Sequence, residues 1–301
     1  MHSKNGKISP NSNIEVRCGT MPSGTIKVNK PPPQPIIGPP PKSTKYKGVK
    51  HTIMVMSGKG GVGKSTVSVN LSVTLAKKYR VGLIDADING PDDPKMLGVS
   101  DAEITAKDNQ ILPVSSKYGV DVISMAFLLP TEDTAVIWRG ALRHKAIQQF
   151  LEEVAWGERD FIILDMPPGT GDEGLTVAQL VPEVEGVIIV VTPQDVALLD
   201  AKKAINFAKQ MEIPVLGIVE NMSGFVCPHC GETVDIFKRG GGEEAAKKYG
   251  VPFLGRIPLI PEVVANSDDG VPSASTNEVV GKAFDGITEK LIEAIGKKKK
   301  K

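Results

Sequence analysis

The sequence of 301 residues has few cysteines and no long apolar segment. Its three cysteines, Cys18, Cys227 and Cys230, are too few for one chain to supply the four thiolates of an all-cysteine metal site. No run approaches the roughly 18 consecutive apolar residues of a membrane helix, and the first residues lack the apolar segment of a secretory signal. We therefore expect a cytoplasmic protein that does not span a membrane.

Apolar residues are also scarce in the first 50 positions, which include a proline-rich run at residues 31–41. Such a segment cannot build a core and is typical of a disordered, partly polyproline tail. The rest of the chain is long enough for one large core, since 41% of all residues are apolar. We expect a disordered tail over residues 1–50, one folded domain over 51–296 and a basic tail over 297–301.

Charge is distributed unevenly along the chain. Residues 1–50 contain nine Lys or Arg and one Glu, and the last five residues are all lysine. Residues 51–296 therefore hold 22 basic and 34 acidic side chains, a net charge of about −12. An acidic body argues against a nucleic-acid groove, so we expect no nucleic-acid partner. The basic ends are typical of solubilising segments, and contact with a polyanion is the alternative.

A glycine-rich segment at residues 57–66 matches the phosphate-loop pattern G-x-x-x-x-G-K-[ST]. Residues 52–56 before it form an apolar, strand-like run, and residues 64–79 after it have a helical pattern. Backbone N–H groups of such a loop face an anion at the helix N-terminus. Lys64 is then expected to reach the β- and γ-phosphates, Ser65 to supply its hydroxyl to Mg²⁺, and Thr66 to donate to the α-phosphate. The loop residues predicted to bind the nucleotide are Gly58, Lys59, Gly60, Gly61, Val62, Gly63, Lys64, Ser65 and Thr66.

Four further apolar runs indicate the fold class. They are continuous rather than alternating, which suits strands buried on both faces of a parallel sheet. These runs lie at residues 81–85, 161–165, 187–191 and 215–219, and helical patterns lie at 141–154, 176–180, 196–211 and 243–249. The order predicts a doubly wound α/β fold, with a mostly parallel sheet flanked by helices, as in P-loop NTPases.

Acidic residues stand where two of these strands end. Asp165 fits the carboxylate that holds the Mg²⁺ shell opposite Ser65, and Asp85 with Asp87 provides two carboxylates beside the γ-phosphate. We favour Asp87 as the group that positions the attacking water. The alternative is that some of these acids only cap helices or loops.

Lys59 is a second lysine in the phosphate loop. It cannot easily reach its own nucleotide if Lys64 already does, whereas a dimer partner could place it across the interface, as an arginine finger is placed. The segment KGGVGKST at residues 59–66 resembles the deviant Walker A of the MinD, ParA and nitrogenase iron-protein superfamily. This resemblance implies that ATP is sandwiched between two subunits.

Five more motifs resemble the Mrp/ApbC group of iron–sulfur cluster carrier ATPases, over about residues 50–290. They are DADINGP at 85–91, IWRG at 137–140, DMPPGTGD at 165–172, VTPQ at 191–194 and ENMS at 220–223. The resemblance implies a homodimeric ATPase in which Asn221 recognises adenine. It also implies apo iron–sulfur proteins as recipients of the cluster, with a cluster-assembly scaffold as a further partner.

The chain departs from this group in two places. The group usually has a serine after Gly-Pro in the first switch, whereas this chain has Asp92 followed by Asp93, which adds negative charge near the phosphates. The N-terminal tail lacks the four-cysteine motif of the eukaryotic relatives and contains only Cys18, so we expect no permanent cluster there and treat Cys18 as an incidental thiol.

Cys227 and Cys230 form a C-x-x-C motif within the loop at residues 221–231. Two thiolates are half of the set that a [4Fe–4S] cluster or a structural zinc ion needs, and a two-fold axis would bring four together. The resemblance implies a labile [4Fe–4S] cluster shared across the dimer. A zinc ion in the same place, or a redox-active or inert cysteine pair, are the alternatives. His229 reads as a spacer.

The apolar residues between 279 and 295 recur at helical spacing, and lysines follow. MinD-like ATPases bind membranes through a basic amphipathic helix at this end. We favour a helix that covers the sheet instead, because its polar face is not predominantly basic. The alternative function is thus a MinD/ParA-like positioning ATPase, with a structural zinc or an unmetallated C-x-x-C.

Overall fold

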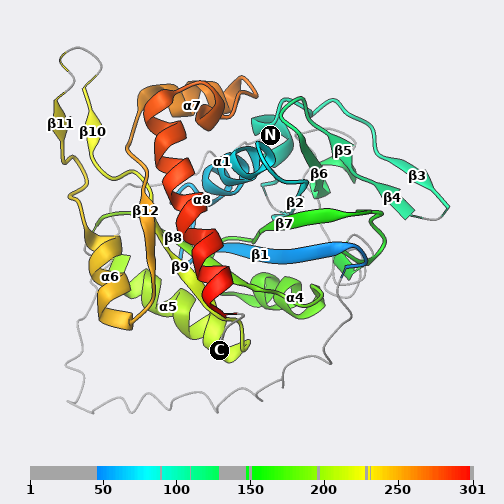
Figure 1. The fold of residues 1–301 in the computed structure, drawn as a ribbon, viewed down its shortest axis with the longest axis horizontal. Helices are drawn as coiled ribbons and strands as arrows, with labels where there is room; N and C mark the ends of the chain where they lie inside the picture. The colour runs from blue at the N-terminus through cyan, green and yellow to red at the C-terminus, as the bar shows by residue number, and fades with distance from the viewer. Residues whose placement is uncertain are drawn as a thin grey trace, which may run out of the picture. The chain divides into compact units, whose positions relative to one another are not determined.

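The computed structural model describes residues 46–88, 90–108, 110–128, 147–148, 151–194, 197–227, 230 and 232–298. Contacts within the chain separate Met1–Gly38 from Pro39–Lys301, and every described residue belongs to the second unit. At its centre is an eight-stranded sheet in the order β12-β9-β8-β1-β7-β2-β6-β5 (Figure 1). Its neighbouring strands are parallel, except that β5 runs antiparallel to β6. The predicted doubly wound, mostly parallel fold is confirmed.

The bounds of the elements are as follows. The strands of this sheet are β1 (Val49–Ser57), β2 (Val81–Asp85), β5 (Val114–Ser115), β6 (Val120–Ser124), β7 (Arg159–Asp165), β8 (Gly186–Val191), β9 (Val215–Glu220) and β12 (Phe253–Arg256). Two small hairpins pair β3 (Thr105–Lys107) with β4 (Gln110–Leu112) and β10 (Phe225–Val226) with β11 (Thr233–Val234). The helices are α1 (Lys64–Ala76), α2 (Asp93–Met96), α4 (Asp172–Leu180), α5 (Ala197–Gln210), α6 (Gly241–Tyr249), α7 (Pro261–Asp268) and α8 (Glu278–Lys298), with 3-10 turns η1 (Met125–Leu128) and η2 (Ser273–Ser275).

Helices cover both faces of the sheet. Residues of α1 and α8 share one apolar cluster with Ile53 and Val55, whereas residues of α4, α5 and α6 share the other with Met54 and Met56. Successive residues of β1 therefore point into opposite cores. This is why the strand sequences are apolar throughout instead of alternating.

The last helix packs on the sheet. Phe284, Ile287 and Leu291 of α8 are buried in the same cluster as α1 and the strands, so the expected covering role is confirmed. Among the helices that the structure describes, none is both long and apolar enough to cross a membrane.

The predicted strands are all observed, and β1 extends beyond its apolar run at both ends. Helix α1 stops at Ala76, before the predicted end at residue 79, because the chain turns there to enter β2 and Tyr79 packs edge-on against Phe161 at 5.1 Å. Most of the helix predicted at 141–154 lies outside the described residues. So do residues 1–45 with Cys18, the motif at 137–140, Asn89 and His229.

Candidate nucleotide site and cysteine hairpin

The glycine-rich loop connects the carboxyl end of β1 to the first turn of α1, beside the ends of β7 and β8. Gly63 has a φ of +78°, in the left-handed region, and a Cβ there would collide with the side-chain amide of Asn221. Gly58 packs so closely on the backbone of Asp200 that a Cβ there would also collide. Both pattern glycines are therefore required by the conformation or by the close approach of the loop to its neighbours.

Lys64, Ser65 and Asp165, three of the predicted site residues, lie in contact with one another. The Lys64 ammonium, only 6% exposed, donates to Oδ2 of the fully buried Asp165, and Ser65 Oγ donates to the same oxygen at 2.8 Å. Burial acts to lower the pKa of Lys64, but the Asp165 carboxylate outweighs it, so the pKa lies above its ordinary value. The lysine is thus held charged at the end of β7.

Ser68 is a residue of this cluster that we did not predict. Its hydroxyl donates to Oδ1 of Asp165, the oxygen that Lys64 and Ser65 leave free. The available signal was its spacing, because a residue four positions after Lys64 lies on the same face of α1. Together the three donors orient the Asp165 carboxylate at the start of the helix.

Asp85 lies opposite Asp165 in the parallel register of β2 and β7. Its carboxylate is buried and accepts hydrogen bonds from Ser124 Oγ at 2.8 Å and from the backbone N–H of Asp87 at 3.2 Å. Burial, followed by the neighbouring charge of Asp165, raises the pKa of Asp85 from 3.8 to about 8. The half-buried Asp87 accepts a hydrogen bond from the Gly90 N–H at 3.3 Å, which fixes the turn after β2.

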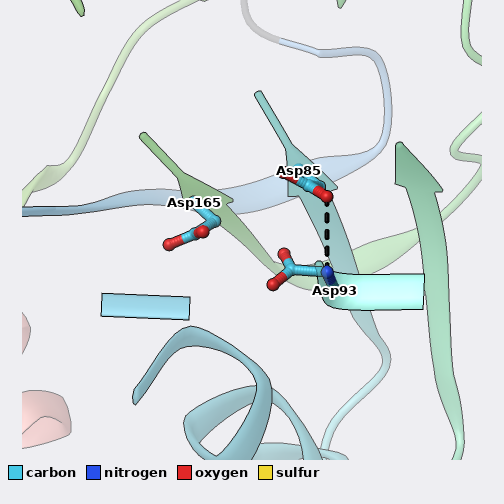
Figure 2. A group of neighbouring side chains, drawn as sticks. All are labelled: Asp85, Asp93 and Asp165. Carbon is cyan, nitrogen blue, oxygen red and sulfur yellow. Dashed lines mark hydrogen bonds between the residues drawn. The ribbon is translucent and has the colours of Figure 1, made fainter. Parts of the chain in front are cut away.

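Asp93 is a second residue that we did not place in the site. It is the first residue of α2 and is completely buried; its carboxylate points toward Asp165, and its backbone N–H donates to Oδ2 of Asp85 at 3.4 Å (Figure 2). One carboxylate oxygen from each of these three aspartates lies within 4.8 Å of the others. Burial and then the charges of Asp165 and Asp85 raise the pKa of Asp93 well above its usual range. The sequence showed two adjacent aspartates here, but it could not show that Asp93 is buried while Asp92 is exposed.

Lys59 is held away from this cluster. Its ammonium lies 3.1 Å from Oδ2 of Asp200 in α5 of the same chain, and the lysine side chain is 37% exposed. Ser57 Oγ donates to the Lys59 carbonyl at 2.7 Å and so fixes the backbone at this point of the loop. The structure therefore brings Lys64, Ser65 and Asp165 together and leaves Lys59 at a neighbouring helix.

Asn221 lies directly after β9, and its Nδ2 donates to the carbonyl of Val62 in the glycine loop at 2.9 Å. Asn221 and Thr66 line a cavity of about 230 Å³ whose other wall includes Pro258, Leu259 and Ile260. Apolar walls with a few polar groups suit a flat aromatic ligand such as a nucleobase. The cavity adjoins the phosphate loop through Thr66, so one molecule could occupy both.

The cysteines lie on the β10–β11 hairpin. Cys227 follows β10, and its N–H donates to the Glu232 carbonyl at 2.9 Å, which continues the hairpin ladder. Neither cysteine forms a disulfide within the described part of the chain; Cys227 is half-buried and Cys230 is exposed. The base of the hairpin is attached to the body by the hydrogen bond from Leu259 N–H to the Gly224 carbonyl at 2.8 Å. Leu259 also lines the cavity at Asn221.

A parallel sheet with a glycine loop between β1 and α1, and with carboxylates at the ends of β2 and β7, defines the P-loop NTPase fold. A family model described as ParA, NUBPL iron-transfer P-loop NTPase, matches residues 48–292. The chain therefore belongs to this family, and the resemblance inferred from its motifs is confirmed. An iron–sulfur cluster carrier protein of Methanocaldococcus jannaschii is 50% identical over 252 residues, which cover 83% of this chain and 87% of the relative.

Solved structures agree with this assignment. A nucleotide-binding protein of Archaeoglobus fulgidus, solved in complex with ADP, has 40% identity and a TM-score of 0.69, covering 77% of this chain and 91% of its own. The septum site-determining protein MinD of Pyrococcus horikoshii, solved with Mg-ADP, superposes with a TM-score of 0.61 over 82% of this chain and 98% of its own. At 23% identity, the MinD comparison supports the fold alone.

Proposed function

We propose that this chain is a homodimeric ATPase that carries a [4Fe–4S] cluster on Cys227 and Cys230 of both subunits and transfers it to apo iron–sulfur proteins. The observation that carries the proposal is the position of two cysteines on a hairpin whose base is hydrogen-bonded to Leu259, a residue that lines the candidate nucleotide cavity. Relatives named iron–sulfur cluster carrier proteins, at about 50% identity, support the cargo. A cluster-assembly scaffold is a further partner, as donor.

The proposed binding of ATP rests on the glycine-rich loop and on the contacts among Lys64, Ser65 and Asp165. Backbone N–H groups of residues 58–66 would hold the phosphates of ATP, with Lys64 on the β- and γ-phosphates and Thr66 beside the α-phosphate. The hydroxyl of Ser65 and the carboxylate of Asp165 are hard oxygen donors that fit Mg²⁺, which when bound offsets phosphate charge. Asp87 would orient the attacking water.

Two residues are assigned by their surroundings. Asn221 would recognise adenine, since it lines the apolar cavity beside the loop. Lys59 would act on the nucleotide of the partner subunit, as in the deviant Walker A loops that it resembles. This role requires its ion pair with Asp200 to open when two subunits meet.

The cysteine part of the proposal follows from the number of thiols. One chain offers two thiolates on the hairpin, and a [4Fe–4S] cluster takes four. A two-fold axis that places two hairpins together completes the set. The hairpin begins a few residues after Asn221, so a nucleotide that moves this loop would also move the cysteines.

Anaerobic reconstitution with iron and sulfide tests the proposed cargo. The wild-type chain should acquire the broad visible absorption of a [4Fe–4S] cluster, and the Cys227→Ala/Cys230→Ala variant should not. Cys18→Ala is the matched control and should reconstitute like the wild type. An undiminished cluster spectrum in the double variant would remove these cysteines from the site. Zinc without iron, in protein purified without oxygen, would support the structural-zinc alternative.

A further inference from the structure

Three buried carboxylates meet where β2, β7 and the first turn of α2 come together (Figure 2). Asp85 and Asp165 stand opposite each other at the strand ends, and the chain returns eight residues after Asp85 to place Asp93 beside both. All three side chains are at most 1% exposed. The cluster is therefore withdrawn from water.

The three carboxylates differ in their hydrogen bonds. Asp165 accepts from Lys64, Ser65 and Ser68, and Asp85 accepts from Ser124 and from the backbone. Neither side-chain oxygen of Asp93 has a hydrogen-bond partner within the described part of the chain. An ionised carboxylate that is buried without partners is costly, so Asp93 in its ionised form requires a further group beside it.

The charges of the cluster indicate what that group is. Lys64 contacts Asp165 and can balance one of the three carboxylates. Two negative charges remain in this buried cluster of carboxylates when all three are ionised. A hard divalent cation such as Mg²⁺ or Mn²⁺ matches both the charge and the donor atoms.

We propose that Asp93 is a third carboxylate ligand of a divalent cation that Asp85 and Asp165 also hold, and that these residues bind the cation in the absence of nucleotide. The inference deepens the Mg²⁺ site proposed at Ser65 and Asp165 and in that sense rests on it. The inference gives a ligand role to Asp93, one of the two aspartates by which this chain departs from its group in the first switch. Because Asp93 is the first residue of α2, the cation would contact this helix. The position of α2 then depends on the cation as well as on the nucleotide.

Titration of the nucleotide-free full chain with Mn²⁺ tests the inference, with free Mn²⁺ followed by its paramagnetic resonance signal. Mn²⁺ suits the experiment because the cysteine thiolates favour softer metals. The wild-type chain, stripped of metal with a chelator and desalted, should bind one Mn²⁺ per chain, and Mg²⁺ should displace it. Asp93→Asn keeps the size of the side chain but should weaken Mn²⁺ binding about tenfold or more.

Asp92→Asn is the matched control, because it removes the same charge from the adjacent, exposed residue and should bind Mn²⁺ as the wild type does. Thermal unfolding of each variant, with and without Mn²⁺, reports folding separately: the wild type should gain stability from the metal, and Asp93→Asn should be folded but gain less. Equal Mn²⁺ affinity in Asp93→Asn and wild type would overturn the inference.

The outcomes also separate this inference from the proposed function. If the nucleotide-free chain binds no Mn²⁺ but hydrolyses ATP with Mg²⁺, the inference fails and the ATPase remains. If it binds Mn²⁺ through Asp93 but hydrolyses no ATP, the cation site stands and the proposed function fails.

Discussion

Lys64 and Asp165 form an ion pair in the structure, but the proposed function gives each of them a different partner when nucleotide binds. Without nucleotide they neutralise each other in a buried position. With ATP and Mg²⁺, the phosphates would take the ammonium and the cation would take the carboxylate. Binding of ATP and Mg²⁺ would thus replace the partner of each side chain by another group of opposite charge. Neither Lys64 nor Asp165 would be left as an isolated buried charge.

Replacing Lys64 by alanine should abolish most of the activity. The variant loses the lysine ammonium that would contact the β- and γ-phosphates. Steady-state ATP hydrolysis, measured as phosphate release, should therefore fall by about 100-fold or more. Lys77→Ala is the matched control, because Lys77 follows directly after α1 and its ammonium forms an exposed ion pair with Asp285. Comparable hydrolysis by the Lys64 and Lys77 variants would exclude the assigned role.

Replacing Lys59 by alanine should separate binding from turnover. If Lys59 acts across the dimer, nucleotide affinity should be retained while turnover falls by about 10³-fold, the lower range for an arginine finger. Asp200→Asn removes the same intrachain ion pair but leaves the lysine in place, so it should turn over ATP far better than Lys59→Ala. Equal losses in the two variants would indicate that the ion pair alone matters.

At the scale of elements, the long buried strands could be predicted from the sequence. Each is a continuous apolar run because its side chains enter cores on both faces, and this signal is local. The phosphate loop was equally clear, since it requires glycines at fixed spacing between a strand and a helix. The strand β6 was not predicted, although four of its five residues are buried.

The short elements could not be predicted in this way. The hairpin strands β3, β4, β10 and β11 have two or three residues each, too few for a periodic pattern. Helix α2 has four residues, and the burial of Asp93 arises only when the chain folds back onto the ends of β2 and β7. The place of Asp93 in the site therefore depends on tertiary structure, which a local sequence pattern does not show.

The loop conformation gives a prediction for two glycines. Gly63→Ala should destabilise the nucleotide-free chain more than Gly61→Ala, as measured by denaturant unfolding. Both positions have a positive φ, which costs about 1–2 kcal/mol for alanine. A Cβ at Gly61 meets nothing within 4 Å, whereas one at Gly63 displaces Asn221 from its hydrogen bond to Val62, at a further cost of about 1 kcal/mol. Equal losses of stability would contradict the observed packing of Asn221 on the loop.

At the scale of the whole molecule, two features are incomplete in one chain. The hairpin offers two of the four thiolates that a cluster needs, and Lys59 is paired with its own α5 rather than with the Lys64–Asp165 cluster. A symmetric second copy would supply the missing half of each. The central claim is therefore that the functional unit is a dimer that shares one cluster.

Native mass spectrometry of the anaerobically reconstituted protein tests this claim most directly. The proposed arrangement predicts a species with the mass of two chains plus one [4Fe–4S] cluster, and iron and sulfide analysis should give four of each per two chains. The Cys227→Ala/Cys230→Ala variant should show no such species. A cluster bound to a single chain, or a dimer that contains zinc and no iron, would contradict the proposal.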